Sequence, residues 1–118
     1  MAHFAIAATW GPTDPTRAML PFIFAASALQ DGDTVSLMLF HDAVHMATKG
    51  LPDEVVPFGP PQRYDVVASH PNAEIWVCKP CAVSRHITPE IMDSRVTVAG
   101  MNEFHAAAKR EDAKVVTF

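Results

Sequence analysis

A chain of 118 residues and 12.8 kDa is long enough for one domain with a single hydrophobic core, and we expect residues 1–118 to form that domain. With 49% hydrophobic and only 19% charged residues, most of the chain should be buried, and part of its surface should be covered by other subunits. The net charge of -4 and the scattered Lys and Arg residues exclude nucleic acid as the main partner.

The first part of the chain predicts a buried strand followed by a helix. Residues 3–9 are a short apolar run between turn residues, which is typical of a buried strand. Thr13 and Asp14 are suited to cap a helix over residues 15–30, and Pro15 fits its first turn.

The rest of the chain continues to alternate between strand and helix patterns. We expect, in order, a strand at 34–40, a short helical piece at 41–50, a connecting loop at 51–61, a helix at 62–71, a strand at 74–78, a helix or helical turn at 82–87, a strand at 95–100, a helix at 101–112 and a strand at 114–118. This alternation predicts an α/β fold with a largely parallel sheet and helices on both faces.

The most apolar stretch, residues 18–29, is too short to span a bilayer and follows a strand rather than a basic segment. We therefore interpret it as a buried helix, and we expect no membrane partner. With no export signal, a cytoplasmic location is expected, where thiols stay reduced.

Ligands of parallel sheets gather at the carboxyl ends of the strands. In this chain, that rule indicates the loop at 10–14, the loop at 41–45 and the loop that contains Cys78 and Cys81. Because neither GxGxxG nor a P-loop pattern is present, no nucleotide cofactor is expected.

Cys78 and Cys81 form a CxxC pair between a predicted strand and a predicted helix. The positive end of the helix dipole, together with Lys79 and Arg85, is expected to lower the pKa of Cys78 and make it a nucleophile. The alternative is that Cys78 only fills space beneath a helix, as free cysteines often do.

Two other uses of a CxxC pair are less well supported. In a thioredoxin-like site a Trp directly precedes the first cysteine and a cis-proline lies well downstream, whereas here Val77 intervenes and Pro89 is close to the pair. A metal site needs further ligands, and we expect none to be bound because there is no second CxxC. The candidate ligands would be Cys78, Cys81, His41, His45 and His86.

Taken in order, four stretches resemble the DsrE/DsrF-like family, which includes the TusD-type sulfur-relay subunits. They are FAIAATWGPTDPTRA, DGDTVSLMLFHDAVHMATKG, IWVCKPCAVSRHI and AKVVTF. The resemblance implies a three-layer α/β/α sandwich around a parallel five-stranded sheet, and assembly with itself as a trimer or hexamer. One departure is Arg85-His86, where many members have Arg-Gly.

In sulfur-relay members, a cysteine at the position of Cys78 carries sulfur as a persulfide. The resemblance therefore implies that Cys78 accepts a sulfane sulfur from a donor protein and passes it to an acceptor thiol. Cys81 matches a position that is cysteine in some members, so it is either a resolving thiol or a small core residue. The residues expected to line the site are Trp10, His41, His45, Arg85 and His86.

If the chain is active, the resemblance implies a sulfur carrier or sulfurtransferase rather than a hydrolase or dehydrogenase, without a cofactor. The alternative is a non-catalytic oligomeric binding or scaffold subunit, with incidental cysteines or a Cys/His metal site.

Overall fold

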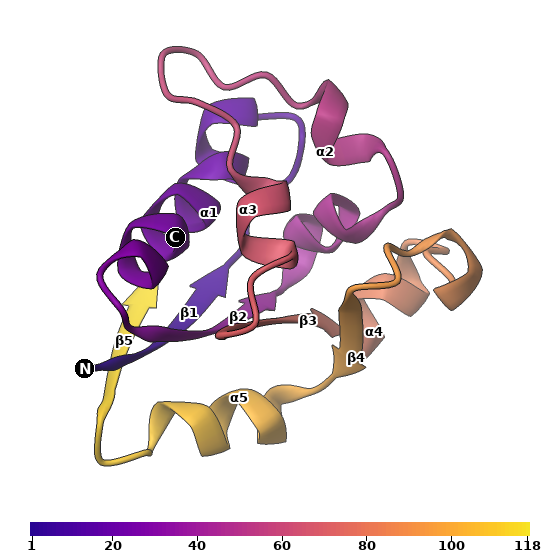
Figure 1. Ribbon diagram of the computed structural model, residues 1–118. Coiled ribbons are helices and arrows are strands. Elements are labelled where there is room, and N and C mark those ends of the chain that lie inside the picture. The colour runs from indigo at the N-terminus through magenta and orange to yellow at the C-terminus, as the bar shows by residue number, and fades with distance from the viewer.

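The computed structural model describes residues 1–118 and contains a five-stranded sheet in which all neighbouring strands are parallel. The strands lie in the order β4-β3-β2-β1-β5, so the three that end in candidate site residues are adjacent and central (Figure 1). Their bounds are β1 (His3–Ala8), β2 (Thr34–Leu39), β3 (Ala73–Cys78), β4 (Val96–Ala99) and β5 (Ala113–Thr117). The α/β fold around a parallel five-stranded sheet is therefore confirmed.

Helices cover both faces of this sheet and complete a three-layer arrangement. Figure 1 shows α1 and α3 on one face and α5 on the other. None of the helices combines the length and the apolar character needed to cross a bilayer. Their bounds are α1 (Pro15–Gln30), the 3-10 helix η1 (His41–Ala47), α2 (Leu51–Glu54), α3 (Tyr64–Ala68), α4 (Lys79–Ser84), the 3-10 helix η2 (Pro89–Ile91) and α5 (Met101–Ala108).

The largest buried side chains join the central strands to the helices in one continuous core. Ile6, Leu37 and Val77, from β1, β2 and β3, are fully buried. Phe22 of α1 meets Tyr64 of α3 with ring centroids 5.1 Å apart. Because close packing of this kind leaves little freedom, the carboxyl ends of the three central strands are held in fixed positions.

The long helix begins and ends where the sequence predicts, at residues 15–30. The Asp14 carboxylate accepts a hydrogen bond from the Arg17 N–H at 3.2 Å, and Pro15 occupies the first turn, where no N–H is needed. After the helix the chain reverses at Gly32, whose φ of +89° favours glycine.

The shorter helices differ from the predicted bounds. The predicted connecting loop at 51–61 contains α2, and the predicted helix at 62–71 is shortened to α3. The helix predicted at 82–87 begins earlier, at Lys79, because Pro80 fits a first helical turn and lets the helix start directly after β3. The predicted helix at 101–112 ends at Ala108.

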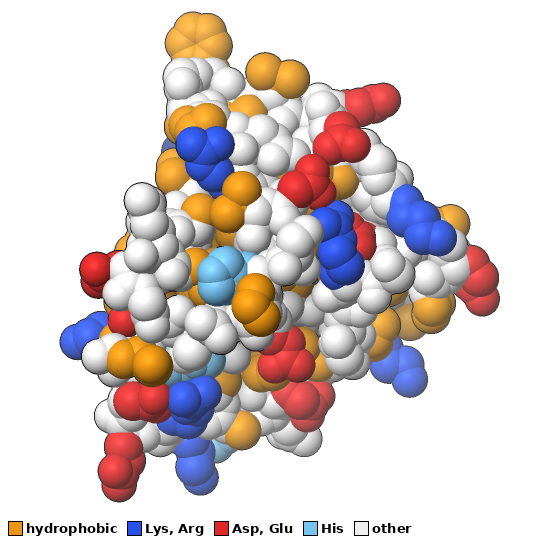
Figure 2. Space-filling model, viewed as in Figure 1, with side chains coloured by type: hydrophobic (Ala, Val, Ile, Leu, Met, Phe, Trp, Pro, Cys, Tyr) orange, Lys and Arg blue, Asp and Glu red, His pale blue; other side chains and the backbone are white.

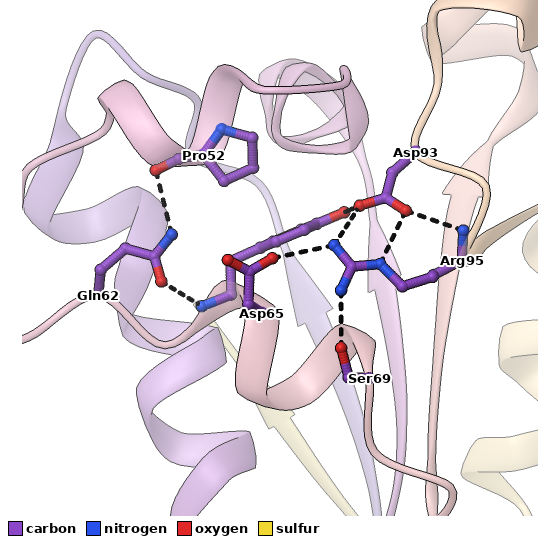
Figure 3. Close-up of polar contacts among 7 residues, drawn as sticks. Pro52, Gln62, Asp65, Ser69, Asp93 and Arg95 are labelled. Atoms are coloured by element: carbon purple, nitrogen blue, oxygen red, sulfur yellow. Dashed lines mark hydrogen bonds and ion pairs between the residues drawn. The ribbon is translucent and has the colours of Figure 1, made fainter.

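An ion-pair network ties α3 to the segment that enters β4 (Figure 3). The Arg95 guanidinium donates to Asp93 at 2.7 Å, to Asp65 at 2.9 Å and to the Ser69 hydroxyl at 2.7 Å. The buried Tyr64 hydroxyl donates to the same Asp93 carboxylate at 3.2 Å. These contacts hold the pKa of Asp93 below its usual range, mainly through the hydrogen bond from Arg95.

Candidate functional site

The carboxyl ends of β1, β2 and β3 bring three of the sequence-predicted segments together. Trp10 lies two residues beyond β1, His41 two residues beyond β2, and Cys78 is the last residue of β3. Because parallel strands end at the same edge of the sheet, segments distant in the sequence come into contact here.

The two cysteines are free thiols with different exposure. Cys78 ends β3 directly before α4, and 7% of its surface is exposed. Cys81 lies in the first turn of α4 and is partly exposed. The Cys81 side chain is close enough to influence the pKa of the Cys78 thiol, so the CxxC spacing does bring the two thiols near each other.

The expected lowering of the Cys78 pKa is wrong. Burial raises the pKa of the Cys78 thiol, and the hydrogen bond with the Cys81 side chain raises it further. The positive charge of Arg85 acts in the opposite direction, as expected, but its effect is smaller. Cys78 is therefore protonated at neutral pH and needs a nearby base or a proton exchange before it can act as a nucleophile.

Cys81 is contacted by the segment that follows β2. The backbone N–H of His41 donates a hydrogen bond to the Cys81 sulfur at 3.2 Å. His41 adopts a left-handed conformation with φ of 54°, which is uncommon for a residue other than glycine. This contact joins the start of η1 to the first turn of α4.

Arg85 links three parts of this site. Its Nε donates to the Asp42 carboxylate at 2.9 Å, and its Nη1 donates to the Cys81 carbonyl oxygen at 3.1 Å. Its Nη2 lies 3.0 Å from Nδ1 of His41. Since arginine can only donate, that ring nitrogen accepts in this contact. The hydrogen bond from Arg85 also holds the pKa of Asp42 below its usual range.

A small pocket of about 220 Å³ lies beside this cluster, between the loop after β1 and the start of η1. Arg17 stacks over the Trp10 ring at 4.6 Å from its centroid. At Gly11 the two loops touch, because a Cβ there would lie 2.6 Å from the Asp42 carbonyl oxygen. The pocket is lined by Thr9, Trp10, Gly11, Thr13, His41 and Asp42.

Two of the predicted histidines stand outside the network of hydrogen bonds around the cysteines. His45 is half-buried in η1 and reaches Asp42 only through its electrostatic effect on the pKa of that carboxylate. His86 is exposed, with φ of 57°, at the end of α4, where many family members have the glycine that such a conformation favours. No group of three or more His, Cys, Asp or Glu side chains is arranged to hold a metal ion, so the five candidate ligands do not converge.

Sequence reasoning missed Asp42, Gly11 and Arg17. Asp42 lies between two predicted histidines in a loop at a strand end, and this position could have identified it as a site residue. The roles of Gly11 and Arg17 depend on how two loops approach each other, which no spacing in the sequence reveals.

A family model for the DsrE/DsrF-like family matches residues 2–118, which is almost the whole chain. The chain belongs to the DsrE/DsrF-like family. The cysteine pair after β3 lies within the matched residues.

The chain is also similar to two relatives and to one solved structure. The chain is 30% identical over 104 residues to uncharacterized protein MK0008 of Methanopyrus kandleri, covering 86% of this chain and 82% of that protein. It is also 30% identical over 117 residues to uncharacterized protein MJ0989 of Methanocaldococcus jannaschii, covering 98% of both chains. The crystal structure of the ychN protein from E. coli superposes on this chain with a TM-score of 0.81, and the match covers 100% of both chains. At 20% sequence identity, this similarity shows the fold alone.

Proposed function

We propose that this DsrE/DsrF-like protein is a sulfur carrier that holds sulfane sulfur as a persulfide on Cys78 and delivers it to an acceptor thiol. The observation that carries the proposal is the pair of neighbouring free thiols at the junction of β3 and α4. The sulfur-relay role of members of this family supports it, because the chain belongs to the family over nearly its whole length.

The chemistry is thiol–persulfide exchange. A cysteine thiolate attacks the outer sulfur of a donor persulfide, the donor S–S bond breaks, and the donor leaves as a thiolate. Delivery is the same step with the roles reversed, since the acceptor thiolate attacks the outer sulfur and Cys78 leaves as a thiolate. The number of sulfane sulfurs is conserved, so the protein needs neither an oxidant nor a cofactor.

The neighbouring residues act as positioning groups in this proposal. Arg85 places positive charge beside the sulfurs and fixes Asp42 and His41. Trp10 lines the adjoining pocket. His45 and His86, which lie outside the network, are better suited to contacts with a partner protein. The activity would be that of a sulfurtransferase or carrier in the cytoplasm, working between a donor and an acceptor protein.

Loading with sulfur tests the proposal. Wild type and the double variant C78S/C81S are treated with sodium tetrasulfide, and excess reagent is removed. The mass of each intact protein is then measured by mass spectrometry. We expect wild type to gain the mass of one sulfur atom and the double variant to gain none. Fragmentation at the Lys79–Pro80 bond, which separates the two cysteines, should place the sulfur on Cys78 at equilibrium. No gain in wild type, with both thiols titrating as free, would contradict the proposal.

A second candidate function is an oligomeric binding or scaffold subunit without sulfur chemistry. The burial of Cys78 and the raised pKa of its thiol favour this alternative. Apolar side chains at the surface also suit a subunit of a larger assembly. Assembly is expected of a carrier as well, so only the sulfur-loading experiment separates the two functions.

A further inference from the structure

The two thiols of the CxxC pair are not equivalent in this structure. An incoming donor has access to Cys81, which is partly exposed, whereas only 7% of Cys78 is exposed. Sulfur exchange requires the attacking sulfur to approach the donor S–S bond directly, so its rate depends on access as well as on the thiolate fraction. On both counts the buried Cys78 is the poorer first acceptor.

Contacts from His41 and Arg85 hold Cys81 in a defined position. Its sulfur accepts the backbone N–H of His41 at 3.2 Å, and its carbonyl oxygen accepts from Arg85 at 3.1 Å. The first contact places the Cys81 sulfur against the segment that follows β2. The second brings a guanidinium close to the residue and fixes the first turn of α4, because Arg85 is in turn held by Asp42.

We propose that donor sulfur arrives at Cys81 and is then passed inward to Cys78, so that the two thiols act in sequence. This inference rests on the proposed carrier function and assigns Cys81 a catalytic role in it. Cys81 is thus the receiving thiol, and Cys78 is the storage thiol, where the persulfide is shielded from solvent.

Each step of this internal relay is balanced. In the first step the Cys81 thiolate attacks the outer sulfur of the donor persulfide, and the donor leaves as a thiolate. In the second step the Cys78 thiolate attacks the outer sulfur now held on Cys81, and the bond between that sulfur and the Cys81 sulfur breaks. Cys81 leaves as a thiolate and takes up the proton released by Cys78. No external redox reagent enters either step.

The closeness of the two thiols, at the end of β3 and in the first turn of α4, makes the second step efficient despite the raised pKa of Cys78. A reaction between groups held together in one molecule proceeds as if each were present at a very high local concentration. That gain offsets the small thiolate fraction of Cys78, and it is absent when Cys78 must attack a donor in solution. The same thiol is therefore slow with an external donor and fast with its neighbour.

The experiment follows the position of the sulfur over time. Wild type, C81S, C78S and the control V83A are mixed with sodium tetrasulfide, and samples are quenched with iodoacetamide at intervals. The peptide that holds both cysteines is then fragmented at the Lys79–Pro80 bond. Val83 is an exposed residue of α4 without a polar role, so its truncation controls for general disturbance of the helix.

In wild type and V83A we expect sulfur to appear first on Cys81 and later on Cys78. In C78S the sulfur should load Cys81 at the wild-type rate and stay there. In C81S the loading of Cys78 should be slower by about tenfold or more, because the remaining thiol is buried and protonated. A persulfide trapped on Cys81 in C78S would not form if Cys81 had a purely structural role.

Two results would overturn the relay. One is loading of Cys78 in C81S at the wild-type rate, and the other is labelling of Cys78 before Cys81 in wild type. If circular dichroism shows that C81S is misfolded, the order of labelling in wild type and the trapping of sulfur in C78S still test the relay. If wild type takes up no sulfur at all, the carrier function itself fails, which is a different result from either of these.

Discussion

His3 is a buried titratable side chain at the end of the sheet opposite the cysteines. Only 3% of the residue is exposed, and its two ring nitrogens contact the hydroxyls of Thr34 at 2.7 Å and Ser36 at 2.9 Å. Burial lowers the pKa of His3 from 6.5, and the positive charge of Arg110 adds to that effect. The carboxylates of Asp112 and Glu74 face the same ring and act in the opposite direction, but the net change is a lower pKa.

A pKa lowered in the folded state links stability to pH with a definite sign. Above the unfolded value near 6.5, neither state binds the proton and the full stability is present. As the pH falls below that value, the unfolded chain binds the proton first, so the free energy of unfolding decreases until the folded pKa has been passed. We expect urea unfolding to show this loss between pH 7.5 and pH 5 in wild type and in the exposed control H105Q, and to show less of it in H3Q. An unchanged pH dependence in H3Q would contradict this account.

At the residue scale, the sequence indicated where the chemistry lies but not its electrostatics. Cys78 and His41 could be singled out because they lie at the ends of strands, and Arg85 because of its charge near the cysteines. The structure brings His41 and Arg85 together beside Cys81. The raised pKa of Cys78 was missed because it depends on how closely η1 and α4 cover the end of β3. Burial of that kind is set by tertiary packing and has no local pattern.

The loop after β1 and the start of η1 touch at a single glycine. A Cβ on Gly11 would lie 2.6 Å from the Asp42 carbonyl oxygen and 2.9 Å from the Asp42 Cβ, which are backbone and near-backbone atoms that cannot move aside cheaply. We expect G11A to lower the free energy of unfolding by about 1–3 kcal/mol, because overpacking of this size forces backbone shifts.

The matched control for that substitution is G100A. A Cβ on Gly100 would meet nothing closer than 3.7 Å, so we expect only a few tenths of a kcal/mol from the changed helix cap. Equal losses in G11A and G100A, measured by chemical denaturation, would show that the contact between the two loops does not limit stability.

The network around Arg95 makes a second prediction for the elements of the fold. R95A removes hydrogen bonds to Asp93, Asp65 and Ser69, which together hold α3 against the entry to β4 (Figure 3). Because Arg95 is partly exposed, solvent screening reduces the effect, and we expect a loss of about 1–2 kcal/mol.

The exposed pair of Arg110 and Asp112 provides the comparison for Arg95. Its two side chains are 47% exposed, and the arginine makes hydrogen bonds to one carboxylate only. We expect R110A to change the free energy of unfolding by about 0.5 kcal/mol or less. A loss in R110A as large as that in R95A would contradict the structural role assigned to the network.

Among the elements, the strands and the long helix were predictable because their signals are local. Apolar runs mark the strands, and Asp14 with Pro15 marks the start of α1. The one-turn helix α2 was not predicted, whereas Pro80 did indicate that a helix begins directly after Cys78. Both depend on proline in a first helical turn within a segment that otherwise has the composition of a loop.

The surface of the single chain leaves several apolar side chains uncovered. Figure 2 shows hydrophobic side chains at the surface, one of them projecting at the top, where Figure 1 places the loop between α2 and α3. In that loop Phe58 is 93% exposed, although its backbone N–H is held by the Thr16 hydroxyl at 2.8 Å. Apolar surface of this kind is normally covered by a partner.

We therefore expect the chain to assemble with itself as a trimer or hexamer, as the family resemblance implies. Light scattering coupled to gel filtration should give a mass of three or six times the chain mass of 12.8 kDa. F58S should weaken the assembly without lowering the thermal stability of the fold by more than a small amount, because Phe58 packs on nothing in the single chain. A monomer at micromolar concentration would contradict the expectation.

For the whole molecule, the fold and family could be predicted because the order of strands, loops and cysteines extends over the full chain. The order in which we propose that the two thiols act could not be predicted, since it rests on their difference in burial and contacts, which arises only in the folded chain.

Delivery of sulfur is the most direct test of the carrier function. Wild-type protein is loaded with sulfur, separated from the donor and mixed with glutathione. The masses of the protein and of the glutathione product are then measured by mass spectrometry. We expect the protein to lose one sulfur atom while glutathione persulfide appears in equal amount. Release of the sulfur as sulfide, with a Cys78–Cys81 disulfide and no glutathione persulfide, would contradict a carrier.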